Sequence, residues 1–127
     1  MVTKTSRVAV VDDDPFVLRG LRRLLRSAGF DVDTYASGAD FMDAVAAAGP
    51  DCVVLDLHMP GTTGFDVQAC LAQRGLATPV IVITGDDTPE AQSKALRLGA
   101  TAYLGKPVDE AALLAAIAAA TRASDSS

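Results

Sequence analysis

The chain has 127 residues, of which 50% are hydrophobic, as is typical of one globular domain with a substantial buried core. Its formal net charge of −5 argues against nucleic-acid binding by this domain, because phosphate contacts need a basic face. There is no apolar run of about 20 residues, so we expect no membrane span, and the N-terminus leaves no room for a signal peptide. The two cysteines, Cys52 and Cys70, fit a cytoplasmic protein in which both are small hydrophobic residues.

The first part of the chain predicts a strand, a helix and a second strand. The apolar run at 7–11 predicts a buried strand. Pro15 suits the first position of a helix with Asp14 as its N-cap, and the helical spacing of apolar residues lasts until Gly29. Residues 30–35 alternate in polarity and predict a second, less buried strand.

A short helix and the most apolar strand follow. Ser37 and Asp40 resemble a capping box, so a helix is expected to begin there and to end near Gly49. Residues 52–55 form a short apolar run that contains two β-branched valines, as in a central parallel strand. Asp56 comes directly after this run, so its carboxyl group is expected to be held rigidly where a buried strand reaches the surface.

The pattern of a strand followed by a helix then continues. A third helix is expected from about 64 to 74, and the fully apolar residues 79–83 predict a fourth strand that ends at Thr84. Asp87 is expected to open the fourth helix, which Gly99 ends.

The C-terminal part predicts a fifth strand and a last helix. The strand is expected at 101–104, and Asp109 or a neighbour begins an alanine-rich helix with Leu113 and Ile117 facing inward. Residues 121–127 are polar and are expected to fray.

Five strand–helix units of this kind predict an α/β fold. Alternating strands and helices require a parallel sheet with right-handed crossovers, covered by helices on both faces. The expected segments are an N-terminal extension at 1–6, one domain at 7–121, and a polar tail or the start of a linker at 122–127.

Polar side chains follow four of the predicted strands at the point where each strand ends. They are Asp12, Asp13, Asp56, Thr84 and Lys106. The carboxyl ends of parallel strands meet at one edge of a sheet, and that edge is where open α/β folds bind ligands. We therefore expect these side chains to form one site.

Three carboxylates at one site repel each other, and a divalent cation relieves that repulsion. Oxygen ligands and a partly hydrated ion suit Mg²⁺, for which Mn²⁺ is able to substitute. We expect Asp13 and Asp56 to bind the ion directly and Asp12 to act through water, with the backbone carbonyl of His58 as a further ligand.

Asp56 is the expected nucleophile, which accepts a phosphoryl group as an acyl phosphate. The cation shields Asp56 from the negative donor. Lys106 offers a positive charge to the phosphoryl oxygens, Thr84 offers a hydroxyl donor, and Gly85 leaves space beside the site.

These motifs resemble the receiver domain of two-component response regulators, the CheY-like family. The matching segments span the domain in order. They are VVDDD at 10–14, VVLDLHMPGTTG at 53–64, VIVITG at 80–85 and GATAYLGKP at 99–107. Details such as LDLHMPGTTG look most like receivers of the FixJ type, which usually precede a DNA-binding domain.

The resemblance implies a flavodoxin-like three-layer sandwich with strand order 2-1-3-4-5. It implies a phosphohistidine donor on a sensor histidine kinase or a histidine phosphotransfer protein, and a cis peptide bond before Pro107. It also implies that phosphorylation pulls Thr84 inward and lets Tyr103 turn in. The surface formed by the fourth helix, the fifth strand and the fifth helix then binds an output domain or protein, or a second copy of the chain.

Other residues have both a functional and an ordinary interpretation. His58, the single histidine, and Asp86 flank the expected site, where they are candidates for tuning hydrolysis of the phosphoryl group. The first helix carries a stripe of arginines that is either a solvated face or a docking face for an acidic partner. These arginines are Arg19, Arg22, Arg23 and Arg26.

Three rival functions fit less well. A haloacid-dehalogenase-like phosphatase would use Asp12 and Asp14, but its lysine precedes the second acidic motif, whereas Lys106 follows it. A nucleotide or flavin site needs a glycine-rich loop after the first strand, and here that loop is acidic. A degenerate receiver that only binds proteins would not need Asp56, Thr84 and Lys106 together.

Overall fold

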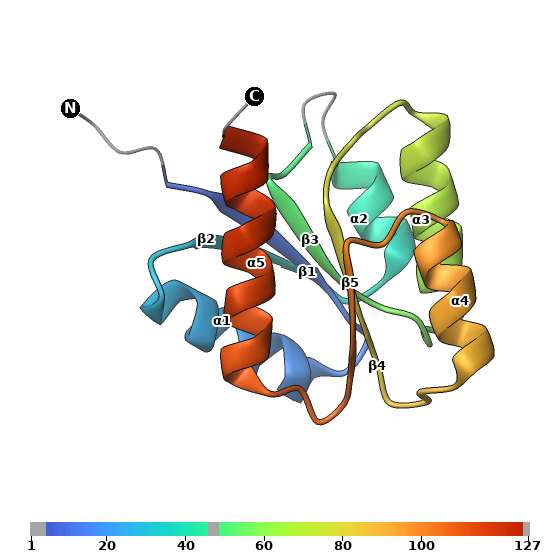
Figure 1. Cartoon of the computed structure of the whole chain (residues 1–127), viewed down its shortest axis with the longest axis horizontal. Coiled ribbons are helices and arrows are strands. Elements are labelled where there is room, and N and C mark those ends of the chain that lie inside the picture. The colour runs from blue at the N-terminus through green and yellow to red at the C-terminus, as the bar shows by residue number, and fades with distance from the viewer. Residues whose placement is uncertain (1–4, 46–48, 126–127) are drawn as a thin grey trace.

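The computed structural model describes residues 5–45 and 49–125. Strands and helices alternate along the chain (Figure 1). The strands are β1 (Arg7–Val11), β2 (Asp31–Tyr35), β3 (Cys52–Asp56), β4 (Val80–Thr84) and β5 (Ala102–Gly105). The helices are α1 (Pro15–Ser27), α2 (Gly38–Ala44), α3 (Gly64–Gln73), α4 (Pro89–Arg97) and α5 (Glu110–Asp125).

The sheet is parallel with strand order β2-β1-β3-β4-β5, which confirms the predicted fold class and order. Helices α1 and α5 cover one face, while α2, α3 and α4 cover the other (Figure 1). Because all strands run the same way, the ends of β1, β3, β4 and β5 lie along one edge.

The sheet separates two apolar cores. Val53 and Leu55 of β3 face the α2–α3–α4 side, whereas Cys52 and Val54 face the α1–α5 side. Every residue of β3 and β4 is buried, so neither strand can shift its register without exposing apolar side chains. No helix in the described ranges is long and apolar enough to cross a membrane.

Both cysteines are free thiols, as expected. Cys52 is fully enclosed in β3, and burial, followed by the negative charge of Asp51, raises the pKa of its thiol to about 12. Cys70 on α3 is partly exposed and packs against the α2–α3–α4 core.

The second helix ends earlier than predicted. Helix α2 begins after its N-cap Ser37, whose side chain accepts a hydrogen bond from the Asp40 amide, and it ends at Ala44. Val45 donates the last helical hydrogen bond to the Phe41 carbonyl but has an extended backbone, because its side chain turns onto the core. Residues 46–48, through which the predicted helix runs, lie outside the described residues.

The N-cap of α4 is Thr88, so the prediction of Asp87 at this position is wrong by one residue. The Thr88 hydroxyl oxygen accepts a hydrogen bond from the Ala91 amide, and Pro89 occupies the first helical position. A residue before proline prefers an extended backbone, which is the N-cap conformation, and Thr88 adopts it. Asp87 is thereby free to turn toward β5.

The last strand and helix also differ at their ends from the prediction. Strand β5 covers Ala102–Gly105, one residue later than expected, and α5 continues to Asp125 instead of fraying after residue 120. The Thr121 hydroxyl is buried and donates to the carbonyls of Ile117 and Ala118, so a polar residue continues the helix here. The domain boundary at residue 121 stays a prediction.

Candidate functional site

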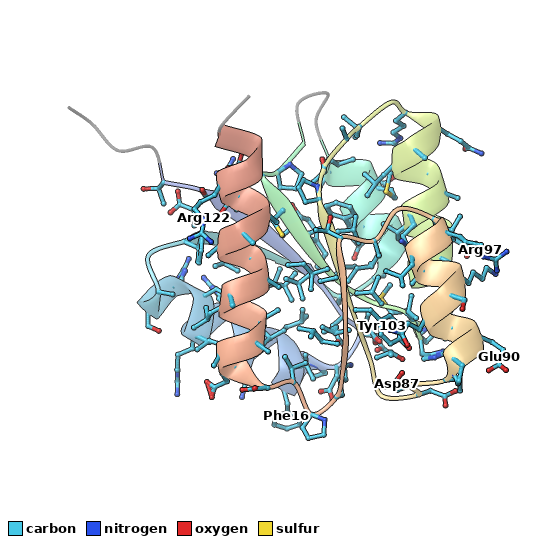
Figure 2. All side chains as sticks on the ribbon, viewed as in Figure 1. Phe16, Asp87, Glu90, Arg97, Tyr103 and Arg122 are labelled. Carbon is cyan, nitrogen blue, oxygen red and sulfur yellow. The ribbon has the colours of Figure 1, made fainter. Side chains whose placement is uncertain are left out.

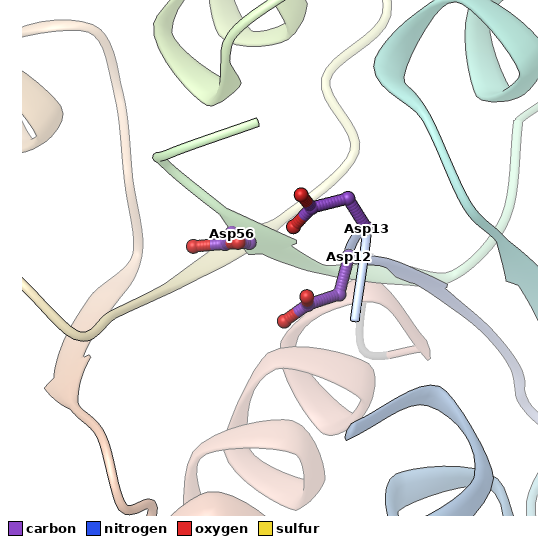
Figure 3. A group of neighbouring side chains, drawn as sticks. All are labelled: Asp12, Asp13 and Asp56. Atoms are coloured by element: carbon purple, nitrogen blue, oxygen red, sulfur yellow. The ribbon is translucent and has the colours of Figure 1, made fainter. Parts of the chain in front are cut away.

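The loop after β1 presents two acids in different ways. Asp12 is fully buried, and its Oδ1 accepts a hydrogen bond of 2.9 Å from the Asp14 amide. Asp13 is exposed, while Asp14 caps α1 by accepting from the Phe16 amide. The turn therefore fixes Asp12 in place and leaves the Asp13 carboxylate in solvent beside it (Figure 3).

Asp56 is the last residue of β3, where the sequence placed it, and only 3% of its surface is exposed. Its Oδ1 accepts a hydrogen bond of 3.3 Å from the His58 amide. The backbone around it is packed against the start of α3, because the Gly64 amide donates to the Leu57 carbonyl. Thr63 and Asp66 form a reciprocal capping box that fixes this end of α3.

Lys106 follows β5 and reaches back across the sheet edge to the acids. Its Nζ lies 2.8 Å from Asp12 Oδ2 and 3.5 Å from Asp56 Oδ2. Both oxygens of Asp12 thus have protein partners, whereas Asp13 has none of these contacts. The Lys106–Pro107 peptide bond is cis, as the resemblance implied.

One acidic oxygen from each of Asp12, Asp13 and Asp56 lies within 4.8 Å of the others, so the cluster could bind a metal ion (Figure 3). Mg²⁺ binds oxygens at about 2.0–2.1 Å, so the ligands on opposite sides of one ion lie roughly 4 Å apart. The three carboxylate oxygens, all within 4.8 Å of one another, are therefore close enough to share one such ion. Of the three acids, Asp13 is the exposed one, and it makes none of the contacts that Asp12 and Asp56 make with Lys106.

The electrostatics of the site are set by burial and by opposed charges. Burial raises the pKa of Asp56, and the Asp12 charge raises it further, while Lys106 and the His58 amide act in the opposite direction. Burial by itself lowers the pKa of Lys106, but Asp12 and Asp56 outweigh it, so that pKa is raised overall. Without a bound cation, Asp56 therefore resists ionisation and Lys106 holds its proton.

Asp56→Asn is expected to stabilise the metal-free protein by about 1 kcal/mol at neutral pH. The folded state binds the Asp56 proton more tightly than the unfolded state, so the native Asp56 loses stability as pH rises through its raised pKa. The gain should therefore vanish in acid, where Asp56 is protonated in both states. Urea unfolding of the parent and of Asp56→Asn across the acid range measures the difference in their free energies of unfolding. A gain in stability that persists in acid would show that it does not come from the Asp56 charge.

Three more expected residues line the same depression. Its lining consists of Asp12, Asp13, Asp14, Asp56, His58, Gly85, Asp86 and Lys106. His58 Nε2 lies 3.8 Å from Asp86 Oδ2, and both side chains are largely exposed. They therefore flank the mouth of the site, as expected from the sequence.

Thr84 and Tyr103 do not line this depression. Thr84 is fully buried, and its hydroxyl oxygen accepts a hydrogen bond from the Asp86 amide. The Tyr103 hydroxyl is enclosed without a hydrogen-bond partner in the described structure, although burial and the nearby Asp87 carboxylate raise its pKa. Figure 2 shows Tyr103 between β5 and α4 with Asp87 beside it. The proximity of Asp87 to Tyr103 was not predicted, because it depends on Thr88 being the N-cap of α4.

The four arginines of α1 are exposed and line one patch of that helix. Next to the site lies a surface that sequence analysis missed. Phe16, with 75% of its surface exposed, Gly20 and Leu24 of α1 face Pro107 and Val108 across an apolar groove that also touches Lys106. Phe16 projects from the end of the molecule that carries the site (Figure 2), and the Arg19 guanidinium lies 5.6 Å from its ring centroid.

A family model described as the response regulator receiver domain matches residues 8–118, which is most of the chain. The chain belongs to this receiver family.

The transcriptional regulatory protein FixJ of Azorhizobium caulinodans is 40% identical over 112 residues, covering 88% of this receiver and 53% of FixJ. The response regulator protein TodT of Pseudomonas putida is 36% identical over 122 residues, covering 96% of this receiver and 54% of TodT. The receiver thus spans about half the length of these relatives.

Solved structures agree with this assignment. A response regulator receiver protein from Burkholderia phymatum is 46% identical with a TM-score of 0.81, covering 92% of this chain and 95% of that one. The response regulator StyR is 38% identical with a TM-score of 0.87, covering 94% of this chain and 60% of StyR. The chain is therefore a receiver of two-component signal transduction.

Proposed function

We propose that Asp56 is the phosphoacceptor of this receiver and that it accepts its phosphoryl group in a Mg²⁺-dependent reaction. The observation that carries the proposal is the position of Asp56, which lies beside Asp12, Asp13 and Lys106 at the carboxyl edge of the sheet. Asp12 is paired with Lys106, and Asp14 caps α1, so neither carboxylate is an equivalent nucleophile.

The proposed transfer uses a phosphohistidine of a sensor histidine kinase or a phosphotransfer protein as the donor. An Asp56 carboxylate oxygen attacks the phosphorus, the P–N bond breaks, and its electron pair stays on the imidazole, which then takes up a proton. Mg²⁺, or Mn²⁺ in its place, would be held by Asp13 and Asp56, by Asp12 through water and by the His58 carbonyl. When bound, it supplies charge neutralisation.

The chain's own residues then stabilise the product. Lys106 Nζ, now shared between Asp12 and Asp56, pairs with a phosphoryl oxygen. The Thr84 hydroxyl donates to another, and Gly85 leaves room because only the Lys106 side chain comes within 4 Å of where its Cβ would be.

Incubation with Mg²⁺ and acetyl phosphate, followed by intact mass measurement, tests the proposal. We expect an adduct of phosphoryl mass on the parent, none on Asp56→Asn, and none when a chelator removes the metal. Asp31→Asn, at an exposed acid of β2, is the matched control and should form the adduct. Absence of the adduct on the parent, or its presence on Asp56→Asn, would overturn the assignment.

We propose further that the arginine patch of α1 docks an acidic face of the phosphodonor protein. The patch lies on α1, the helix that follows Asp12 and Asp13 in the chain. Exposed charges of one sign act chiefly on the association rate.

Charge reversal at Arg22 and Arg23 is expected to slow transfer from a protein phosphodonor by about tenfold at low salt. Phosphorylation by acetyl phosphate should be unchanged, because that donor needs no docking face. The two rates are measured on the same preparation. Equal transfer rates from the protein donor before and after reversal would refute docking at these arginines.

We propose that Thr84 and Tyr103 transmit the phosphorylation of Asp56 to the α4–β5–α5 surface. That surface then binds an output domain or protein, or a second copy of the chain.

His58 and Asp86, at the mouth of the site, are proposed to set how fast water removes the phosphoryl group. An unchanged decay rate of the phosphorylated protein after both are replaced would contradict this role. We expect a cytoplasmic receiver that shows no independent turnover of a phosphomonoester.

A further inference from the structure

Helix α4 is held against α3 by two contacts that involve side chains of one face of α3. Gln68 and Phe65 lie one helical turn apart, and they meet the adjacent residues Ala95 and Lys94 of α4. The N-terminal end of α4 joins the loop that follows Thr84, and Ala91 and Ala95 pack the helix onto the α2–α3–α4 core. The contacts to α3 therefore bear on how α4 responds to the phosphorylation site.

The Gln68 contact is buried and polar. Gln68 is 3% exposed, and its Nε2 donates a hydrogen bond of 3.0 Å to the Ala95 carbonyl. Its Oε1 is enclosed without a partner in the described structure. An amide with one unmet acceptor is costly to bury, so apolar packing alone would favour leucine at this position of the α3 face.

The acceptor of this bond is a main-chain carbonyl in the last turn of α4. The Ala95 carbonyl also accepts from the Ala100 amide, and Leu96 accepts from Gly99, whose φ is +100°. These bonds form the C-terminal turn of α4. Gln68 thus binds the C-terminal end of the helix.

The second contact lies next to the first. Lys94 Nζ lies 4.4 Å from the centroid of the Phe65 ring, within the range of a cation–π interaction. Phe65 is partly buried against the α2–α3–α4 core, while Lys94 is exposed. Together, Phe65 and Gln68 with Lys94 and Ala95 form what we call the α3–α4 latch.

We propose that the α3–α4 latch holds α4 in its unphosphorylated position and so opposes the switch. In this structure the Thr84 hydroxyl oxygen accepts a hydrogen bond from the Asp86 amide. The loop that contains Asp86 leads into α4, whose C-terminal turn the latch binds. If phosphorylation moves Thr84 and with it α4, contacts made only in the starting position disfavour the phosphorylated state. This inference rests on the proposed function of Asp56.

Gln68→Leu and Lys94→Met each remove one half of the latch. Leucine keeps the bulk at position 68 and eliminates the unpartnered Oε1, and Ala95 keeps its bond from Ala100. Because Lys94 is exposed, its variant folds even if the core variant does not. Arg74→Met is the matched control, since Arg74 links α3 to the Met42 carbonyl of α2, away from α4.

The experiment is a titration of each protein with beryllofluoride, a phosphoryl mimic, in Mg²⁺, followed by ¹⁹F NMR. We expect both latch variants to bind roughly threefold to tenfold more tightly than the parent, and Arg74→Met to bind equally. Amide exchange of residues 91–99 should be faster in the latch variants before any ligand is added.

The outcomes separate the two proposals. Failure of the parent to bind beryllofluoride, with no acetyl phosphate adduct, would overturn the proposed function and the latch with it. Binding by the parent with equal affinity in the latch variants would overturn the latch alone. An equal gain in Arg74→Met would also overturn it, because loosening α3 from α2 leaves the α4 contacts intact.

Discussion

Gly64→Ala is expected to destabilise the receiver by about 3 kcal/mol or more. A Cβ at this position would overlap the Asp56 carbonyl and lie 2.8 Å from Leu57 Cα. These are backbone atoms at the end of buried β3, so no side chain can rotate away to make room. Either α3 or the Asp56 loop must move, and urea unfolding measures the loss.

Gly20→Ala provides the matched control. Gly20 lies within α1 and is exposed, and no atom beyond its chain neighbours and the backbone of its own helix lies within 4 Å of where its Cβ would be. Alanine there should stabilise the protein by about 0.5–1 kcal/mol, because it removes glycine's conformational freedom from a helix. A Gly64→Ala protein as stable as the parent would mean that α3 does not rest on the Asp56 backbone.

Lys106→Met is expected to destabilise the metal-free protein by about 2–3 kcal/mol at neutral pH. Asp12 is fully buried, and its Oδ2 has no other cation within the described site. Methionine keeps the stem of the side chain but leaves that carboxylate without its partner. The Lys106 side chain is 23% exposed, so solvent weakens the pair and the expected loss of stability is smaller than for a fully buried pair.

The loss of stability in Lys106→Met depends on pH because both the Lys106 amine and its carboxylate partners titrate. The Lys106 pKa is raised, so its contribution is present below the unfolded value near 10.5 and is lost as pH rises through the folded pKa. In acid the carboxylates protonate and the pair also disappears. The difference between parent and variant should therefore peak near neutrality, and Arg97→Met, at an exposed cation of α4, should show no such peak.

The grouping of Asp12, Asp13, Asp56 and Lys106 at one edge of the sheet could be predicted from the sequence, because it depends only on the order of the strands and helices. A parallel sheet brings the residues after β1, β3, β4 and β5 together whatever their separation along the chain. Asp56 and Lys106 are 50 positions apart in the numbering, yet Lys106 Nζ lies 3.5 Å from Asp56 Oδ2. Their pairing needed only the correct order of strands and helices.

The helix ends were less predictable because competing local signals decide them. Asp87 and Thr88 can both cap a helix, and the choice depends on Pro89 fixing the backbone before it. Val45 leaves α2 for the core, and Thr121 stays in α5 by bonding to its own helix. Composition near a helix end does not reveal which of these effects dominates.

Contacts between helices were outside the reach of sequence patterns. Gln68 stands among apolar residues on the α3 face, and a polar residue in such a stripe is a signal that could have drawn attention. Its partner, however, is the Ala95 main-chain carbonyl, which no side-chain pattern marks. Likewise, the choice of Asp12 over Asp13 for Lys106 depends on the turn at Asp14.

The two thiols give this receiver a built-in position for a reporter group. Only a thiolate reacts readily with alkylating reagents, and Cys52 is enclosed with a pKa of about 12. Cys70 is partly exposed on α3, the helix that carries Phe65 and Gln68. A fluorophore or spin label added to the native chain should therefore attach at Cys70 alone, close to the α4 contacts, without any cysteine being introduced or removed.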